Sequence, residues 1–318
     1  MLELKHNGTT VGLAPLVRRT SRRFFRMRKL GFVTHHSDYN DLLLGSRAEE
    51  HWSAFAEFLA RKSEDWEFAD FRELRNTDEG TKPLELALRQ AGLFFRVFSE
   101  DEGCPFLKIQ GGAAESMKRL SGHVRRTLRR RMERAQADGL TVCIIERPDL
   151  EPGLIDALSS LDIKKQAHRE SPTFFAAHPD AFRDLFAYFG PKNGMYVALL
   201  KKEKQPVAFQ LGFRCGSKLW DYTKAYDRSF SRYAPGTLLL PALLDYCAEH
   251  GFEEYDFLRG EEEYKLLWSS GVHRRSRVVV WNRRWASRVS AALFLRYRAP
   301  RSMQNEQGEH AGDSSPLM

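Results

Sequence analysis

The sequence predicts an α/β protein made of two units. Apolar runs of strand length alternate along the chain with segments whose apolar residues recur every three or four positions, as on one face of a helix. At 318 residues the chain has room for two domains, and a hydrophobic share of 42% supplies a core for each. The pair Gly111-Gly112 marks the expected boundary between the units.

The first unit is expected to begin with a β-hairpin. Asn7-Gly8 separates two strand-like runs, Met1–Lys5 and Thr10–Val17, and an Asn-Gly pair is a strong hairpin signal. Over residues 48–60, Trp52, Phe55 and Leu59 have the spacing of one helix face. The remaining elements of this unit are expected as strands over 66–74, 93–98 and 106–109 and a helix over 84–91, which starts after Pro83 and stops at Gly92.

The second unit is expected to open with an arginine-rich helix over residues 114–137. Leu120, Val124 and Leu128 recur every four residues and form a narrow apolar stripe, while arginines cover most of the remaining circumference. The arginines are Arg125, Arg126, Arg129, Arg130, Arg131 and Arg134. A strand over 141–146, a helix over 152–165 and a helix that starts at Pro179 and ends at Gly190-Pro191 follow.

The stretch 195–268 matters most for function. Runs at 195–200, 207–213 and 219–226 predict three antiparallel strands, and in the last of them alternation places Trp220, Tyr222 and Tyr226 on one face. The turn that begins at Tyr233 then opens into a helix, which is followed by a strand that ends at Gly260. Because the first amide groups of a helix lack internal partners, this opening beside the sheet could hold a phosphate or an acyl group.

The C-terminal part is expected to contain a strand over 277–281, an amphipathic helix over 283–297 and a polar, disordered tail. The predicted domains are 1–112, 113–298 and the tail 299–318.

Basic residues are concentrated in three places. Seven lie between Arg18 and Lys29, eight between Lys118 and Arg134, and nine between Arg274 and Arg301, within a net charge of +8. Such clusters favour anionic partners, which include an anionic membrane surface, although a solvated basic surface explains them equally well.

The cysteines and the N-terminus predict a cytoplasmic protein. Four cysteines, at 104, 143, 215 and 247, have no metal-ligand spacing and are expected to be reduced. Residues 1–17 lack the apolar core of a signal peptide, and no window is apolar for the length of a membrane span.

The order of several motifs resembles the GNAT superfamily of acyltransferases. The resemblance is greatest to the FemAB-like branch, which includes Fem-type peptidyltransferases and acyltransferase-like proteins associated with bacterial cellulose synthesis. It is carried by the block Ser121–Arg134, Ala225-Tyr-Asp, Tyr233-x-Pro-Gly, Tyr255-Asp-Phe-x-x-Gly and Tyr264-Lys. It covers about Leu120–Trp268 well and the N-terminal third weakly. It implies tandem GNAT-like mixed-sheet domains, of which the first lacks the strand and helix with which it normally begins. Either the gene start is called too late or this domain is truncated at its N-terminus.

The resemblance also implies an acyl donor site. In the superfamily a turn at this place binds the pyrophosphate of coenzyme A, which corresponds here to Tyr233, Pro235, Gly236, Thr237 and Leu238. Backbone amides of a splayed strand pair contact the acyl carbonyl, which we expect at Phe209, Gln210 and Leu211. Because the family usually has more glycines at the turn, aminoacyl-tRNA stays open as a less favoured donor beside acyl-CoA. A plain turn without a ligand is the other interpretation.

Transfer to an amine requires that the amine lose a proton and that the reactants be held together. Tyr226 and Asp256 are the candidate catalytic residues because they lie in the matching motifs. The candidate substrate-binding residues are Asp221, Tyr222, Arg259 and Lys265. A purely structural role is the alternative for each of them.

Two functions therefore remain. The first is an acyltransferase that acts on an amine or hydroxyl of a polysaccharide or cell-envelope precursor. The second is a non-catalytic accessory protein of the same fold, which binds an anionic partner or a membrane through its basic clusters. No hydrolase, zinc-protease or nucleotide-binding motif is present, so we predict no metal, and DNA is not an expected partner.

Overall fold

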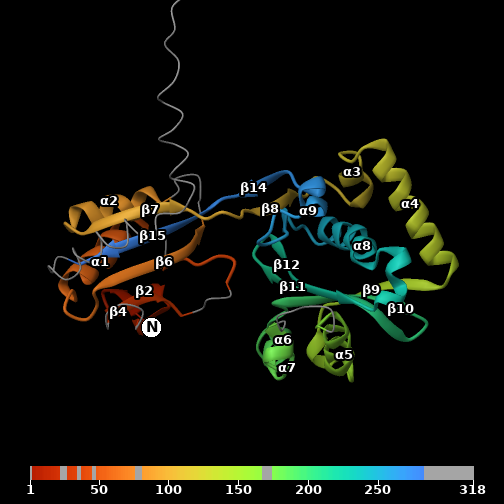
Figure 1. The fold of residues 1–318 in the computed structure, drawn as a ribbon, viewed down its shortest axis with the longest axis horizontal. Coiled ribbons are helices and arrows are strands. Elements are labelled where there is room, and N and C mark those ends of the chain that lie inside the picture. The colour runs from red at the N-terminus through yellow and green to blue at the C-terminus, as the bar shows by residue number, and fades with distance from the viewer. Residues whose placement is uncertain are drawn as a thin grey trace, which may run out of the picture. The chain divides into compact units, whose positions relative to one another are not determined.

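The computed structural model describes residues 2–21, 27–33, 37–44, 48–75, 81–166 and 174–282 and divides the chain into two compact units. The first unit comprises residues 1–101 together with 274–318, and the second comprises residues 102–273 (Figure 1). The helix predicted over 283–297 and the tail 299–318 lie outside the described residues. In both units helices pack on mixed sheets, which confirms the predicted α/β class.

A hairpin begins the first unit. Strands β1 (Leu2–His6) and β2 (Thr9–Ala14) pair in antiparallel fashion, and the short strand β5 (Leu43–Leu44) pairs with the other edge of β2. Asn7 and Gly8 join β1 to β2 with φ angles of 49° and 79°, which is the left-handed backbone of a type I′ turn. The hairpin predicted from this pair is confirmed.

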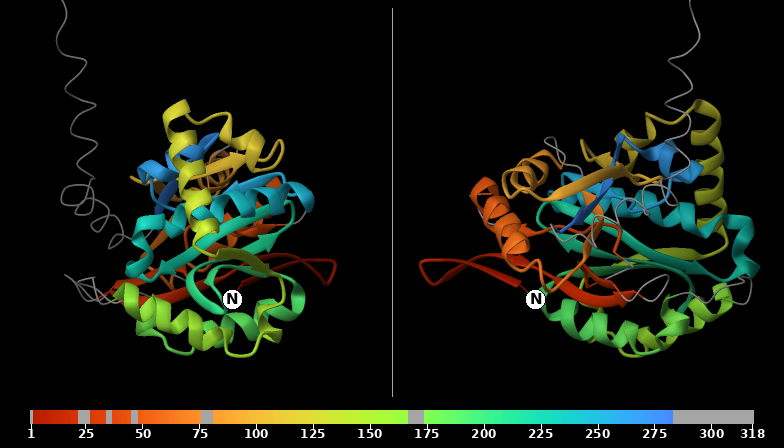
Figure 2. Two further views of the ribbon diagram at one scale, coloured as in Figure 1. Left: turned by 90° about the vertical axis from the view of Figure 1, so that its right-hand side faces the viewer. Right: turned by 60° about the vertical axis from the view of Figure 1, so that its left-hand side comes forward.

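The main sheet of the first unit has the strand order β3-β4-β6-β15-β7. Helices α1 (Ala48–Arg61) and α2 (Lys82–Gln90) cover one of its faces, where Leu59 and Leu88 share a core with Phe71 (Figure 2). The strands are β3 (Leu16–Ser21), β4 (Met27–Phe32), β6 (Phe68–Arg75), β7 (Phe94–Ser99) and β15 (Arg275–Trp281).

Strand β15 joins the first unit although it follows the second unit in sequence. It lies between β6 and β7 and pairs with both in antiparallel fashion. Val278 and Val280 enter the core under the helices, whereas Val279 and Trp281 pack on the opposite face, so both faces of the strand are buried. The boundaries of the compact units therefore differ from those of the predicted domains 1–112 and 113–298. The reason is that the apolar sequence of a strand does not reveal which sheet the strand joins.

The second unit is built on a seven-stranded sheet of order β14-β8-β13-β12-β11-β10-β9. Helix α8 (Pro235–Glu249) lies on one face with α3 (Ala113–Met117) and α4 (Gly122–Ala137), and α5 (Leu154–Gln166), α6 (Phe174–Ala177) and α7 (Ala181–Phe189) lie on the other (Figure 1). The strands are β8 (Cys104–Lys108), β9 (Leu140–Ile145), β10 (Met195–Lys202), β11 (Gln205–Cys215), β12 (Lys218–Tyr226), β13 (Glu254–Asp256) and β14 (Gly271–His273).

The arginine-rich segment forms two helices, where the sequence predicted one. Ser121 separates α3 from α4, and its hydroxyl caps α4 by accepting a hydrogen bond from the Val124 amide at 3.3 Å. Leu128 is buried as expected. The arginines at 126, 129, 130, 131 and 134 are exposed.

None of the helices in the described ranges has the length and apolar character needed to cross a membrane.

Candidate active site

Strands β12 and β13 separate at the centre of the second unit's sheet. They run parallel and pair only where Lys218–Trp220 meets Glu254–Asp256. Strand β12 continues to Tyr226, held on its other side by β11. Within the described residues no strand pairs with the β13 side of residues 221–226, which we call the open edge. Backbone groups along an open edge must find other partners, and a bound ligand can supply them.

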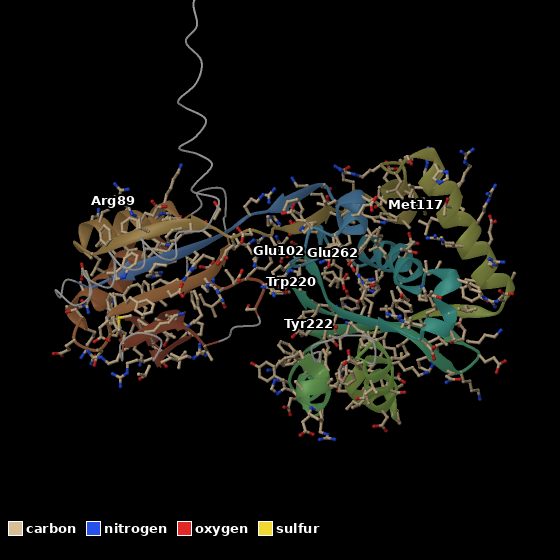
Figure 3. All side chains as sticks on the ribbon, viewed as in Figure 1. Arg89, Glu102, Met117, Trp220, Tyr222 and Glu262 are labelled. Atoms are coloured by element: carbon tan, nitrogen blue, oxygen red, sulfur yellow. The ribbon has the colours of Figure 1, made fainter. Side chains whose placement is uncertain are left out.

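A β-bulge lies at the start of the open edge. Gly212 of β11 pairs with Asp221, whereas Leu211 pairs with Thr223, so Tyr222 is the extra residue that the bulge inserts into β12 (Figure 3). A side chain at Gly212 would meet the Trp220 carbonyl oxygen at 1.9 Å, which explains the glycine. Bulges of this kind change the direction of side chains next to functional sites.

The bulge also breaks the predicted alternation. Tyr222 packs with the core under α5–α7 and Ala225 is part of that core, so Tyr226 points to the α8 face. The prediction that Trp220, Tyr222 and Tyr226 share one face is therefore wrong for Tyr226, which lies 39% exposed at the end of β12.

The first turn of α8 follows the open edge along the chain. It starts at Ala234, which has a left-handed φ of 52°, and the Thr237 amide and hydroxyl both donate to the Ala234 carbonyl at 2.8 Å. A Cβ placed on Gly236 would have no atom within 4 Å. Gly236 therefore has open space beside it, and its amide is a first-turn amide without an internal helix partner.

The other predicted residues of this turn are buried. Tyr233 is 2% exposed, and its hydroxyl donates to Asp138 at 2.5 Å while Arg232 donates to it. This contact anchors the turn to the end of α4. Pro235 and Leu238 are buried as well, which leaves Gly236 and Thr237 as the members of the predicted set that face the opening.

Phe209, Gln210 and Leu211 do not fit the role expected for them. They lie in the middle of β11, which pairs with β10 on one side and β12 on the other, so the sheet uses their backbone groups. Gln210 instead donates a side-chain hydrogen bond to Tyr255 in the α8-side core. Backbone groups without a neighbouring strand among the described residues lie one strand further along, on the open edge of β12.

A buried charged cluster borders the open edge on the α8 face. Lys224 Nζ lies 3.1 Å from Asp221 Oδ2 and 4.4 Å from the ring centroid of Tyr264. Burial lowers the pKa of Lys224, but the Asp221 charge and the Tyr264 hydroxyl outweigh it and raise the pKa to about 12. The lysine is thus an ammonium at neutral pH. Lys224 was not predicted as a site residue, although it is three residues from Asp221 on a strand expected at the site, and Tyr264 was named only within the motif Tyr264-Lys.

The two candidate catalytic residues lie on opposite faces of the sheet. Tyr255 belongs to the α8-side core, so Asp256, the next residue of β13, points to the other face. Asp256 is 1% exposed, and its Oδ1 accepts a hydrogen bond from the Leu258 amide at 2.8 Å. Tyr226 and Asp256 are therefore not brought together as an acid–base pair.

Lys265 and Arg259 shape the loop after β13. Lys265 is 6% exposed, donates to the Arg259 carbonyl at 2.6 Å and pairs with Glu262 at 3.0 Å. Arg259 is exposed and lies 3.8 Å from Glu102. Lys265 thus holds the loop, whereas the Arg259 side chain lies at the surface.

Asp256 and two side chains near it have the geometry of metal ligands. Atoms of Glu254, Asp256 and His273 lie within 4.8 Å of one another. However, Lys218 Nζ lies 2.7 Å and His273 Nε2 3.0 Å from the same Glu254 oxygen. An ammonium group already occupies the position next to that carboxylate, so this donor set fits a divalent cation poorly.

Comparisons with known proteins agree with this geometry. The acetyltransferase (GNAT) domain family matches residues 122–266. Among solved structures, FemX is similar with a TM-score of 0.61 and 12% identity, over 87% of this chain and 86% of that chain. The C-terminal domain of a putative lysylphosphatidylglycerol synthetase from Agrobacterium fabrum is similar with a TM-score of 0.56 and 15% identity. The similarity covers 90% of this chain and 85% of that chain.

L-PGS from Bacillus licheniformis gives a TM-score of 0.56 and 14% identity, over 90% of this chain and 86% of that chain. No curated protein matches the chain. Identities this low show a shared fold, and the family match adds the type of domain. Residues 122–266 thus match an acetyltransferase domain of the GNAT type, and the fold of the chain is similar to that of FemX.

Proposed function

We propose that the second unit transfers an acyl group from acyl-CoA to an amine or hydroxyl of a polysaccharide or cell-envelope precursor. The observation that supports this most is the open edge of β12, which leads through the turn Arg228–Tyr233 into the opening of α8. The open edge offers backbone groups to an acyl carbonyl, and the opening of α8 offers its N-terminus and the Gly236 amide to a phosphate.

In this proposal the residues at the open edge have separate roles. Backbone amides next to the bulge polarise the acyl carbonyl while the acceptor nitrogen or oxygen attacks its carbon. Asp221 takes the acceptor's proton, directly or through water, and the ammonium of Lys224 stabilises negative charge on the carbonyl oxygen. The bond from the acyl carbon to its carrier then breaks, and the leaving atom takes a proton.

The comparisons support a cell-envelope acceptor and keep a second donor in view. Lysylphosphatidylglycerol synthetases are named for a lipid product, and FemX is similar over nearly the same share of the chain. An aminoacyl-tRNA could therefore replace acyl-CoA as the donor.

The four cysteines are free thiols, which fits a cytoplasmic protein.

The donor is tested by thermal unfolding with coenzyme A, acetyl-CoA or a charged tRNA. A ligand at about 100 times its dissociation constant stabilises by roughly 2.7 kcal/mol, and we expect this shift with coenzyme A. Gly236→Val should abolish the shift without unfolding the protein, because the added side chain enters open space. Gly122→Val is the matched control, since Gly122 also begins a helix and has open space around it.

The accessory-protein alternative is favoured by one observation, the placement of Tyr226 and Asp256 on opposite faces. If neither coenzyme A nor charged tRNA shifts the melting temperature, this alternative replaces the transferase proposal. A shift with charged tRNA alone would make the aminoacyl donor the correct one.

A further inference from the structure

The first unit contains a pocket that the proposed transfer reaction does not use. It has a volume of about 290 Å³, and all of its lining residues belong to the first unit. Charged and amide side chains form most of the wall: Arg19, Lys29, Asn40, Asp70, Arg72 and Glu73. Its size is at the lower end for ligand pockets, which suits a small metabolite.

The pocket lies at a break in the five-stranded sheet. The parallel pairing of β4 with β6 ends where Gly31 meets Asp70, and a parallel bridge resumes where Asn40 meets Leu74. Asn40 is buried, and its side-chain amide donates to the Arg72 carbonyl at 3.2 Å, which fixes the returning segment at the far side of the break. The sheet thus builds the pocket from its own backbone.

Both carboxylates in the wall are already neutralised. Asp70 accepts hydrogen bonds from Lys29 at 2.6 Å and from Arg277 at 2.7 and 3.1 Å. Although burial raises the pKa of Asp70, Arg277 and Lys29 lower it overall, so the carboxyl stays ionised and paired. Glu73 pairs with Arg275. Neither acid therefore needs a cationic ligand.

The wall also contains two arginines. Arg19 is oriented by a 2.8 Å hydrogen bond from its Nη2 to the Val33 carbonyl. Arg72 is exposed and forms no ion pair with any of the described residues. Val17 and Phe32 supply an apolar part of the lining. Guanidinium groups match carboxylate and phosphate oxygens well because several N–H donors lie in one plane.

We propose that this pocket binds a small organic anion whose carboxylate or phosphate group lies between Arg19 and Arg72 and whose apolar part contacts Val17 and Phe32. Lys29, Arg275 and Arg277 already pair with Asp70 and Glu73, so they leave little charge for a second anionic group on the ligand. A ligand with one anionic end and a short apolar body therefore fits best.

The test measures the melting temperature of the full chain in sodium phosphate, sodium acetate or sodium chloride at equal ionic strength. We expect phosphate or acetate to raise the melting temperature above its value in chloride. The anion that gives the larger increase identifies the group that is bound. Arg72→Gln should remove this increase and Arg72→Lys should keep part of it. The control Arg61→Gln removes an exposed charge at the end of α1 and should keep all of it.

Hydrogen exchange localises the effect, since the bound anion should slow exchange at Phe32, Asn40 and Arg72. Equal increases in the wild type and in Arg72→Gln would show general charge screening and overturn the proposal. An absence of any increase over chloride would overturn it as well. Neither result bears on donor binding in the second unit, which Gly236→Val tests separately.

Discussion

At the scale of single residues, the Asp221–Lys224 pair is the contact on which the candidate site depends most. Asp221 is 4% exposed at its side chain and Lys224 is 29% exposed, so the pair is largely removed from water. Removal of one member leaves the other charge without its partner, which costs far more than the pair gains.

We therefore expect Lys224→Met to lower the free energy of unfolding by about 2–3 kcal/mol, while Asp221→Asn combined with Lys224→Met recovers most of that loss. Urea denaturation measures both variants. Lys118→Met breaks an exposed pair with Glu115 and should change stability by less than about 0.5 kcal/mol. An equally small effect of Lys224→Met would mean that the pair is not formed in solution.

Glu254 should make stability depend on acid pH. Burial raises the pKa of its carboxyl, but His273 and Lys218 outweigh this and lower the pKa to about 2. A lowered pKa gives stability that is present above the ordinary value of 4.5 and is lost as the pH falls toward 2.

The free energy of unfolding should thus fall less steeply between pH 5 and 3 in Glu254→Gln than in the wild type. The full contribution of Glu254 is about 3 kcal/mol. Glu253→Gln, at an exposed neighbour that bonds Ser217, should keep the wild-type slope. Parallel slopes in all three proteins would argue against the lowered pKa.

A site residue could be predicted from the sequence where a local signal determines its position. The opening at Gly236 and Thr237 was predictable because a Pro-Gly start before an apolar run is a local signal. The backbone contact was expected on β11 and not on β12, because sequence does not show which strand loses its neighbour. Lys224 was missed since its orientation depends on a bulge, and a bulge leaves no sequence pattern beyond Gly212.

At the scale of elements, α4 offers the strongest charged surface among the described helices. Its exposed arginines at 126, 130 and 134 form no ion pair within the described residues. Replacement of all three by Gln should weaken polyanion binding and reduce the slope of log affinity against log salt by about 0.7–0.9 for each lost contact. Filter binding of a homopolymeric RNA at several salt concentrations measures this slope.

The control for α4 replaces three exposed cations elsewhere in the second unit, Arg183, Lys192 and Lys204, with Gln. It has the same change in net charge but should keep the wild-type slope. If both triple variants lose affinity equally, net charge alone governs binding and α4 has no specific part in it.

Elements themselves were largely predictable, because apolar periods of 2 and 3.6 residues are local properties. Helices α1, α2, α5, α7 and α8 and strands β6, β7 and β9–β12 lie close to their expected positions. The division between α3 and α4 was not foreseen, since the apolar stripe begins at Leu120, between the two helices, and continues into α4.

At the scale of the whole molecule, the described chain forms two units. The first unit is completed by strand β15, which follows the second unit in sequence. Strand β15 should be indispensable for the first unit, because β6 and β7 meet only through it. A chain that stops after His273 should lose protection from proteolysis within residues 1–101 and keep it within 102–273. A chain that stops after Asn282 retains β15 and should protect both ranges; equal protection in the two chains would refute this role.

The position of β15 also sets an order of events during synthesis on the ribosome. The second unit is a continuous segment, so all of its strands have been made by residue 273, whereas the first unit's sheet must wait for residues 275–281. The part of the chain that is translated first is therefore completed last. Until then β6 and β7 expose unpaired edges, and this interval is when the nascent protein is most dependent on chaperones.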